Sequence, residues 1–326
     1  MNIVYASDNN YADILGVSIV SLFENNRNSK EINVYILDDR IQEDNHIKLL
    51  SIGEKYGRTI IFIPVPDLNK LAGVSIHAND RWSMSAFSRL FLEKIMPISV
   101  EQVIYLDCDI LVNDSLEELF YTDLGNYYCA GVSDCISDQH KANVGLRRGD
   151  YYINSGVMLI SLKNWRNNQL CERFVAFIDE FGGDIPYVDQ GVINGTISEY
   201  IMPLELKFNC YTAIYDFNYK DLMRYRKPTG FYSENEVRVA KEKPSIVHFT
   251  TSFLSLRPWV EGCQHPYISE WLKYKEISPW ADNPLRKDNR SFKKKLAVLI
   301  YKLIPNCIAV QLSGLLHARI VPMLSK

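Results

Sequence analysis

Ile104-Tyr105-Leu106-Asp107-Cys108-Asp109-Ile110-Leu111-Val112 is an apolar stretch that two carboxylates interrupt. The β-branched and aromatic residues before Asp107 are typical of a strand at the centre of a mostly parallel sheet, which is buried on both faces. A carboxylate buried there without a partner is costly, and two are worse. We therefore expect either that something neutralises Asp107 and Asp109 or that both lie just past the strand end in a cleft.

The spacing of these two aspartates has a chemical meaning. In an extended chain, side chains two residues apart point the same way. Two oxygen donors aimed at one point suit a hard divalent cation such as Mn²⁺ or Mg²⁺. The alternative is a surface turn with two solvated aspartates, but the apolar residues on both sides favour a metal site.

Strand and helix patterns alternate along the first 65 residues. We predict strands at 3–6, 32–37 and 59–65, and amphipathic helices at 14–22 and 41–56. This order predicts an α/β fold with a mostly parallel sheet flanked by helices. Ligands bind such sheets beyond the carboxyl ends of the strands, where Asp8 and Asn10 fall. Neither GxGxxG nor GxxxxGK[ST] follows the first strand, which disfavours a dinucleotide-binding fold or a P-loop.

The later patterns predict more elements of the same kind. We expect strands at 103–106, 129–132, 157–162 and 245–249, helices at 85–93 and 163–181, and a loop at 250–259. Asn154-Ser155-Gly156 has the composition of a turn at a strand entrance. A buried Arg89 needs an anionic partner, either a neighbouring aspartate or a ligand phosphate. His248 is either an ordinary core histidine or a third metal ligand beside the aspartate pair.

The composition is that of a globular protein. Of the 326 residues, 47% are hydrophobic and 23% are charged, which allows one large domain or two ordinary ones. The seven cysteines are scattered and form no CxxC pair, so we expect reduced core thiols in a cytosolic protein. Residues 1–6 lack a positive segment, so no signal peptide is predicted. No uncharged apolar run reaches about 18 residues, so no spanning helix is expected.

The charge is unevenly distributed along the chain. From Arg286 onward, nine Lys and Arg residues stand against one acidic residue, Asp288, a formal charge of +8 that leaves −11 for the preceding residues. Residues 286–295 are basic and 296–324 are apolar with interspersed basic residues. This pattern predicts that 286–326 associates with a membrane surface. The alternative is a helical subdomain packed on the core or on another subunit.

Nucleic acid is not an expected partner, because the basic residues are few and are not interleaved with aromatic ones. The change in composition after Trp280 divides the chain into a domain at 1–280 and a basic amphipathic region at 281–326. We expect the protein to be cytoplasmic and peripheral on the inner face of the cell membrane.

Six motifs in order resemble the family 8 glycosyltransferases, which include lipopolysaccharide galactosyl- and glucosyltransferases and glycogenin. They are ASDNNYA at 6–12, SRL at 88–90, YLDCDILV at 105–112, YINSGVMLISL at 152–162, DQG at 189–191 and VHF at 247–249. The resemblance runs from about Met1 to Trp259. It implies a GT-A type fold and the transfer of galactose or glucose from a UDP-sugar to a saccharide acceptor, with retention of anomeric configuration.

The resemblance also implies roles for the matching residues. Asp107, Asp109 and His248 would bind Mn²⁺, with Mg²⁺ as the alternative. Asp8, Asn10 and Tyr11 would hold uracil and ribose, and Gln190 would lie beside the anomeric carbon. The residues that would grip the hexose hydroxyls are Arg89, Asp134, Asn154 and Asp189. The remaining positions that match the donor site are Ala6, Cys108, Ser155 and Arg257.

The chain departs from the family pattern after His248. Members commonly follow this histidine with a glycine and then Lys-Pro-Trp, whose lysine meets the diphosphate. Here the segment is longer, the glycine is absent, and Arg257 stands where the lysine is expected. Arginine can serve a phosphate, often in bidentate fashion. Residues 207–232 and 260–267 would then line the acceptor side.

The predicted function is therefore a Mn²⁺-dependent retaining hexosyltransferase acting on a lipid-linked cell-surface glycan. Gln190 is a poor nucleophile, and Asp189 is expected to bind hydroxyls, so we expect same-face attack with a UDP phosphate oxygen taking the acceptor proton. Two alternatives are a catalytically inactive sugar-nucleotide-binding protein and a metal-dependent sugar nucleotidyltransferase. The latter calls for a Gly-rich basic loop after the first strand, which residues 8–11 do not supply.

Overall fold

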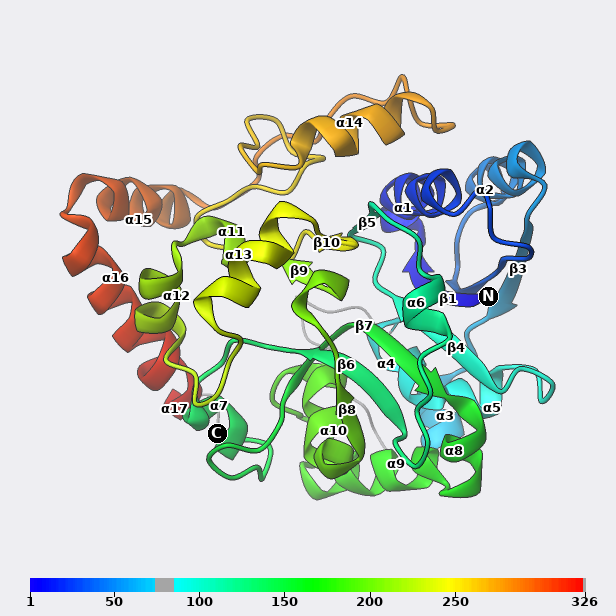
Figure 1. Cartoon of the computed structure of the whole chain (residues 1–326), viewed down its shortest axis with the longest axis horizontal. Helices are drawn as coiled ribbons and strands as arrows, with labels where there is room; N and C mark the ends of the chain where they lie inside the picture. The colour runs from blue at the N-terminus through cyan, green and yellow to red at the C-terminus, as the bar shows by residue number, and fades with distance from the viewer. Residues whose placement is uncertain (74–84, 325–326) are drawn as a thin grey trace.

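The computed structural model describes residues 1–73 and 85–324. A seven-stranded sheet in the order β3-β2-β1-β4-β7-β6-β8 forms the centre of the protein, and a separate three-stranded sheet has the order β5-β10-β9 (Figure 1). The strands are β1 (Asn2–Asp8), β2 (Asn33–Asp39), β3 (Thr59–Pro64), β4 (Gln102–Leu106), β5 (Ile110–Val112), β6 (Cys129–Ser133), β7 (Ile153–Ser161), β8 (Ile201–Pro203), β9 (Cys210–Tyr211) and β10 (Ile246–His248).

Helices surround these sheets. Those of the first half are η1 (Asn9–Tyr11), α1 (Ala12–Asn25), α2 (Glu43–Tyr56), α3 (Leu68–Ala72), α4 (Ser85–Ser88), η2 (Arg89–Phe91), α5 (Leu92–Ile95), α6 (Glu117–Phe120) and α7 (Asp138–Ala142). Those that follow are α8 (Leu162–Asn167), α9 (Leu170–Glu180), α10 (Val188–Ile197), η3 (Ser198–Tyr200), η4 (Leu206–Phe208), α11 (Ala213–Asp216), α12 (Tyr219–Arg226), α13 (Glu234–Glu242) and α14 (Ile268–Glu276). The last are α15 (Phe292–Leu303), α16 (Asn306–Leu315), the π-helical turn η5 (Leu316–Ile320) and α17 (Val321–Leu324).

The large sheet is mixed and mostly parallel, as predicted. β1 pairs in parallel with β2 and β4, and β2 with β3, whereas β7 runs antiparallel to both β4 and β6. Alternate strand residues enter two different cores. Ile104 packs with residues of α1 and α2, and its neighbour Tyr105 packs with residues of α8, α9 and α10. Because both faces are covered, the strands have nearly continuous apolar sequences.

The structure corrects three local predictions. Asn154-Ser155-Gly156 is not a turn but the first part of β7, and Gly156 O accepts a hydrogen bond from Asp107 N at 2.8 Å. The predicted helix at 163–181 is two helices, because Gln169 adopts a left-handed conformation with φ of 51° between them. Asp107 to Asp109 is a turn between β4 and β5, so these residues are not extended chain.

The C-terminal helices run along one side of the protein, where α16 packs on α12 and α17 contacts α7 (Figure 1). Residues Asn306–Leu324 form 19 helical residues, and an 18-residue stretch of them has a mean hydropathy of 1.5 and is 28% buried. By length and composition this segment could cross a membrane, which corrects the expectation that no such segment exists. Arg319 interrupts the segment, and for this reason the sequence shows no uncharged apolar run of about 18 residues. Gly314 allows its close approach to α12, since a Cβ there would lie 2.6 Å from the Arg224 carbonyl oxygen.

Trp280, the last residue of the predicted first domain, packs its ring against α1. Its ring lies so close to Gly16 that a Cβ on that glycine would stand 2.1 Å from Trp280 Cζ3. Its indole N–H donates to Asn45 Oδ1 of α2 at 3.2 Å. Glycine at position 16 is therefore required by packing and not by its backbone conformation.

We expect Gly16→Ala to destabilise the protein, because overpacking a core costs about 1–3 kcal/mol. In a Trp280→Ala background the same change should stabilise it, because alanine is favoured over glycine in a helix by about 1 kcal/mol. Urea unfolding of the four proteins of this double-mutant cycle measures the coupling. An equal effect of Gly16→Ala in both backgrounds would contradict this account of the contact.

Candidate active site

Asp107, Asp109 and His248 converge at the end of the central strand β4. His248 Nε2 lies 3.6 Å from Asp107 Oδ2 and 3.2 Å from Asp109 Oδ1. The antiparallel pairing of β10 with β5 produces this contact, because it sets His248 opposite Ile110. One ligand atom from each of the three residues lies within 4.8 Å of the others. The carboxylates thus lie just past the strand end and beside a partner, which agrees with the expectation from burial.

Asn209 orients the histidine for this role. Its Oδ1 lies 3.0 Å from His248 Nδ1, and its Nδ2 donates to Asn154 Oδ1 at 2.9 Å. Asn209 is fully buried. Since Nδ2 is engaged with Asn154, Oδ1 accepts the proton on His248 Nδ1, which leaves the Nε2 lone pair free to face the aspartates. A partner of this kind fixes the tautomer of metal-binding histidines.

The donor set fits a divalent cation. Two carboxylates are ligands that both Mn²⁺ and Mg²⁺ accept, and the imidazole nitrogen favours the transition metal Mn²⁺ over Mg²⁺. Burial opposes the ionisation of Asp109, but neighbouring positive charge, which includes the Arg257 guanidinium, holds the pKa of this group below its ordinary value, so it is a carboxylate at neutral pH. Gly156 makes room for the cluster, because a Cβ there would stand 2.2 Å from His248 Cε1 and 2.7 Å from Asp107 Oδ2.

Arg89 is buried among carboxylates. Its Nη2 donates to Asp107 Oδ1 at 2.7 Å, and its Nη1 lies 3.2 Å from Asp189 Oδ2. The guanidinium also stacks over the Tyr105 ring, 4.2 Å from its centroid. Asp189 Oδ2 also accepts a hydrogen bond from the Ser155 hydroxyl at 2.9 Å. The anionic partners that the sequence analysis required for Arg89 are therefore two aspartates of the protein itself.

Gln190 is held beside Asp189 by a strained chain segment. Tyr187 and Val188 have positive φ values of 65° and 58°, and for a β-branched residue such as Val188 this is a rare conformation. The Gln190 amide donates to Asp134 Oδ2 at 3.1 Å and accepts from Ser155 N at 3.2 Å. Backbone strain of this kind clusters at functional sites.

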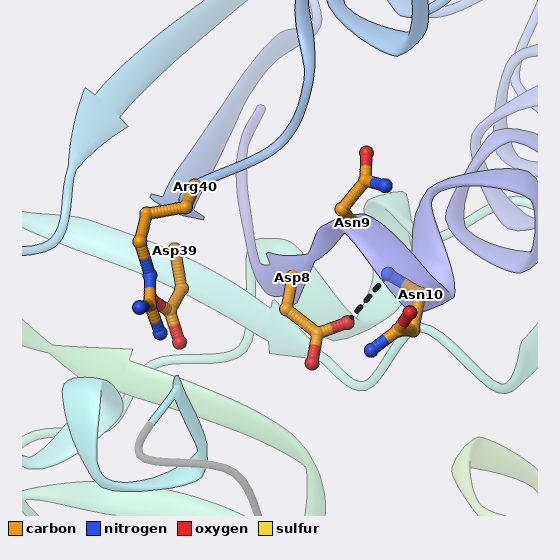
Figure 2. A pocket seen from close by; sticks show the side chains of 5 residues that line it. All are labelled: Asp8, Asn9, Asn10, Asp39 and Arg40. Atoms are coloured by element: carbon orange, nitrogen blue, oxygen red, sulfur yellow. Dashed lines mark hydrogen bonds and ion pairs between the residues drawn. The ribbon is translucent and has the colours of Figure 1, made fainter.

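A pocket opens at the carboxyl ends of β1 and β2. Figure 2 shows Asp8, Asn9, Asn10, Asp39 and Arg40 lining it. Asp8 Oδ1 accepts from the backbone N–H groups of Asn10 at 2.9 Å and Tyr11 at 3.2 Å, which begins the short helix η1. Ala6 lies on the same strand, and its carbonyl oxygen is 3.2 Å from the Cys108 sulfur.

Arg257 connects this pocket to the acidic cluster. Its Nη1 donates to the Tyr11 hydroxyl at 2.8 Å, and its Nη2 lies 3.3 Å from Asp109 Oδ2. The side chain also packs over Trp259, 5.3 Å from the ring centroid. All the residues that the sequence analysis selected thus form one connected region. It assigned no role to Asn209, which lies outside the quoted motifs, or to Tyr105 and Tyr152, which lie inside them. The contacts of these three residues with the site are made by the fold.

Comparisons with known proteins agree with this geometry. LgtC, a galactosyltransferase solved in complex with donor and acceptor sugar analogues, aligns with a TM-score of 0.71 at 26% identity, over 86% of this chain and 96% of its own. The fold is thus of the GT-A type. Residues 2–263 match the model of Glycosyl transferase family 8, and the chain belongs to this family. It is therefore a glycosyltransferase.

Two curated relatives extend the comparison. General stress protein A of Bacillus subtilis is 28% identical over 284 residues, which cover 86% of this chain and 94% of that protein. A lipopolysaccharide 1,2-glucosyltransferase of Escherichia coli is 28% identical over 310 residues, which cover 92% and 86%. Family 8 enzymes use a sugar-nucleotide donor and typically a divalent metal ion, which the Asp107, Asp109 and His248 cluster can accommodate.

We expect Arg89→Met to lower the free energy of unfolding by about 3 kcal/mol, because it leaves buried carboxylates without their partner. Burial already raises the pKa of Asp189, although Arg89 opposes this rise. Without Arg89 the pKa rises further, and the folded state keeps a proton that the unfolded chain releases above about pH 4. The loss should therefore be larger at pH 8 than at pH 5.

Urea unfolding at both pH values measures this effect. The control is Arg27→Met, because Arg27 forms an ion pair with Glu24 on the surface and its side chain is 64% exposed. Equal losses for the two variants would contradict the role assigned to Arg89.

Proposed function

We propose that the protein is a retaining hexosyltransferase that moves galactose or glucose from a UDP-sugar to a saccharide acceptor, with Mn²⁺ as its metal and Mg²⁺ as the alternative. The observation that carries the proposal is the convergence of Asp107, Asp109 and His248 within 4.8 Å of one another. Arg257 connects this cluster to the pocket at Asp8 and Asn10. One site can thus hold both the diphosphate and the nucleoside of a donor.

Different residues of the chain would bind different parts of the donor. When bound, the metal would offset the charge on the leaving UDP. Arg257, held by Tyr11 and Asp109, is positioned to contact the diphosphate, and its planar fork suits phosphate oxygens. Asp8, Asn10 and Tyr11 would bind uracil and ribose, with Ala6 and Cys108 beside them. Preorganised charge of this kind is commonly the largest catalytic contribution.

The hexose would lie over the residues that Arg89 organises. Arg89, Asp134, Asn154 and Asp189 would bind its hydroxyls. Asp189 Oδ2 is already held by Arg89 and Ser155, and Gln190 is held by Asp134 and Ser155. Neither side chain is thus free to attack the sugar, which favours same-face attack within an ion pair, with a UDP phosphate oxygen taking the acceptor proton.

We expect the full chain to release UDP slowly from one UDP-hexose when Mn²⁺ is present and no acceptor is added, and to stop when EDTA is added. Asp109→Asn should lower this rate about 100-fold or more, because it removes a charged metal ligand. The matched control is Asp114→Asn, an exposed aspartate just after β5, which should keep the wild-type rate.

Either of two results would count against the proposal. If UDP is released at the same rate in Mn²⁺ and in EDTA, the reaction does not depend on a metal ion, and this part of the proposal is wrong. Binding of UDP in Mn²⁺ without turnover of any UDP-hexose, even with saccharide acceptors added, would instead indicate an inactive sugar-nucleotide-binding protein.

We also propose that residues 1–280 are the catalytic domain and that 281–326 attach it to the inner face of the cell membrane, where a lipid-linked glycan would be the acceptor. Thirteen of the twenty-two large apolar side chains that are exposed in the described chain lie between Phe292 and Leu324. Lys293, Lys294 and Lys295 are exposed at the start of α15, which has no buried residue. Apolar and basic side chains together favour an anionic lipid surface.

We expect the full chain to sediment with vesicles of phosphatidylglycerol and phosphatidylcholine, and less so as salt increases. The double variant Leu299→Glu/Leu303→Glu should bind these vesicles about tenfold more weakly or worse, because two apolar side chains no longer enter the lipid. Ile98→Glu is the control, since Ile98 is 81% exposed and lies outside the tail. Vesicle binding that both variants share with the wild type would contradict the anchor.

A further inference from the structure

Arg226, at the end of α12, is a partly buried arginine without a carboxylate partner. No ion pair joins it to an acidic residue in the part of the chain that the structure describes. Its one hydrogen bond runs from Nη1 to His317 Nε2 at 3.1 Å, and its buried Nε has no partner. The buried Arg89, by contrast, contacts two carboxylates. A guanidinium removed from water ordinarily needs an anion.

The two histidines near Arg226 do not supply a negative charge. Burial and the charge of Arg226 lower the pKa of His317 to about 2 and that of His140 to about 4, so both are neutral. Because Arg226 donates to His317 Nε2, the proton of His317 is on Nδ1, and this buried N–H is also without a partner. His140 Nδ1 lies 3.0 Å from the Ser137 hydroxyl. The neighbourhood therefore presents unpaired donors and a guanidinium that forms no ion pair within the described chain.

Arg226 and His317 line a pocket that reaches the candidate active site. The residues around it are Asp134, Ile136, His140, Tyr152, Tyr187, Gln190, Arg226 and His317. Asp134 is the one carboxylate among them, and its Oδ2 already accepts from Gln190. It lies close enough to favour the charged form of Arg226 but does not form an ion pair with it. The pocket thus has a catalytic end at Gln190 and a cationic end at Arg226.

We propose that this pocket binds an acceptor that carries a phosphate or carboxylate group, which Arg226 recognises. This inference rests on the proposed function and specifies its acceptor class. The tyrosines between the two ends can pack against a sugar ring, while the guanidinium fork pairs with the anion. An anion there would give Arg226 the direct ion-pair partner that it does not have in the described chain.

The proposal assigns a second role to the C-terminal helices. His317 lies in η5, and the Ser137 hydroxyl donates to the carbonyl oxygen of its neighbour Ala318 at 2.7 Å. The segment that we propose for membrane attachment therefore also contributes His317 to the wall of the acceptor pocket. An acceptor bound there lies beside the surface at which a lipid-linked glycan would be presented.

Binding measurements on the full chain, with UDP and Mn²⁺ present, test the proposal. Isothermal titration with glucose 6-phosphate, glucuronate and methyl glucoside compares two anionic probes with a neutral one. We expect at least one anionic probe to bind the wild type about tenfold more tightly than methyl glucoside. The preferred anion tells a phosphate acceptor from a carboxylate one. Arg226→Gln should lose this preference, and Arg226→Lys should keep part of it.

Arg224→Gln is the matched control, because Arg224 lies on the same helix with its side chain 49% exposed. It should show the wild-type preference, and thermal unfolding verifies that each variant folds. The proposal is overturned if the wild type binds all three probes equally, if it binds none at millimolar concentration, or if Arg226→Gln keeps the preference. UDP release without acceptor is measured separately, so failure of the transferase assignment is distinguishable from failure of the anion site.

Discussion

Several acidic side chains lie together at the end of strand β4. Because they are largely removed from bulk water, their negative charge must be balanced by neighbouring groups of the protein or by a ligand. Asp107, Asp109 and Asp189 lie close to one another. The guanidinium groups of Arg89 and Arg257 form ion pairs with them, and the His248 imidazole faces Asp109. Arg89 comes from a helix that precedes the strand, and the other two come from the chain more than 130 residues later. The charge balance therefore exists only when the large sheet, the small sheet and the loop after β10 are all in place.

Several irregular features serve this same constraint. Gly156 lies within a strand, where glycine is disfavoured, because a side chain would displace His248 and Asp107. The positive φ of Val188 costs conformational energy but places Asp189 and Gln190 at the start of α10. Asn209 is buried at some cost and is compensated by hydrogen bonds to His248 and Asn154. Each of these features fixes the position of a side chain in the cluster through a contact with a buried neighbour.

The C-terminal helices relate to this site through a second electrostatic imbalance. Arg226 has no carboxylate partner in the described chain, and the helix that covers it contributes only a neutral histidine. The side chains proposed to bind the donor are thus paired within the protein, whereas on the proposed acceptor side Arg226 has no ion-pair partner in the described chain. The same helices have an exposed apolar face, and the proposed membrane attachment would bring the proposed anionic, lipid-linked acceptor to this side of the protein.

Local patterns in the sequence were sufficient to predict the α/β class and the central strand at 103–106, because alternation and apolar runs reflect burial directly. They also indicated Asp107 and Asp109 as candidate metal ligands, but they left the role of His248 open, and the family resemblance selected it. Local patterns gave a wrong or no prediction where the role of a residue depends on a contact with a residue far away in the sequence. Asn154-Ser155-Gly156 has turn composition, yet Gly156 stands in a strand because His248 approaches it. Asn209, Arg226 and His317 have no periodic signature, since contacts between remote segments leave none. The sequence alone determined the fold class and the residue types of the candidate metal site, because burial patterns and residue chemistry are local. Only the tertiary structure decided which charged groups form ion pairs and that Arg226 forms none in the described chain, because these contacts join remote segments.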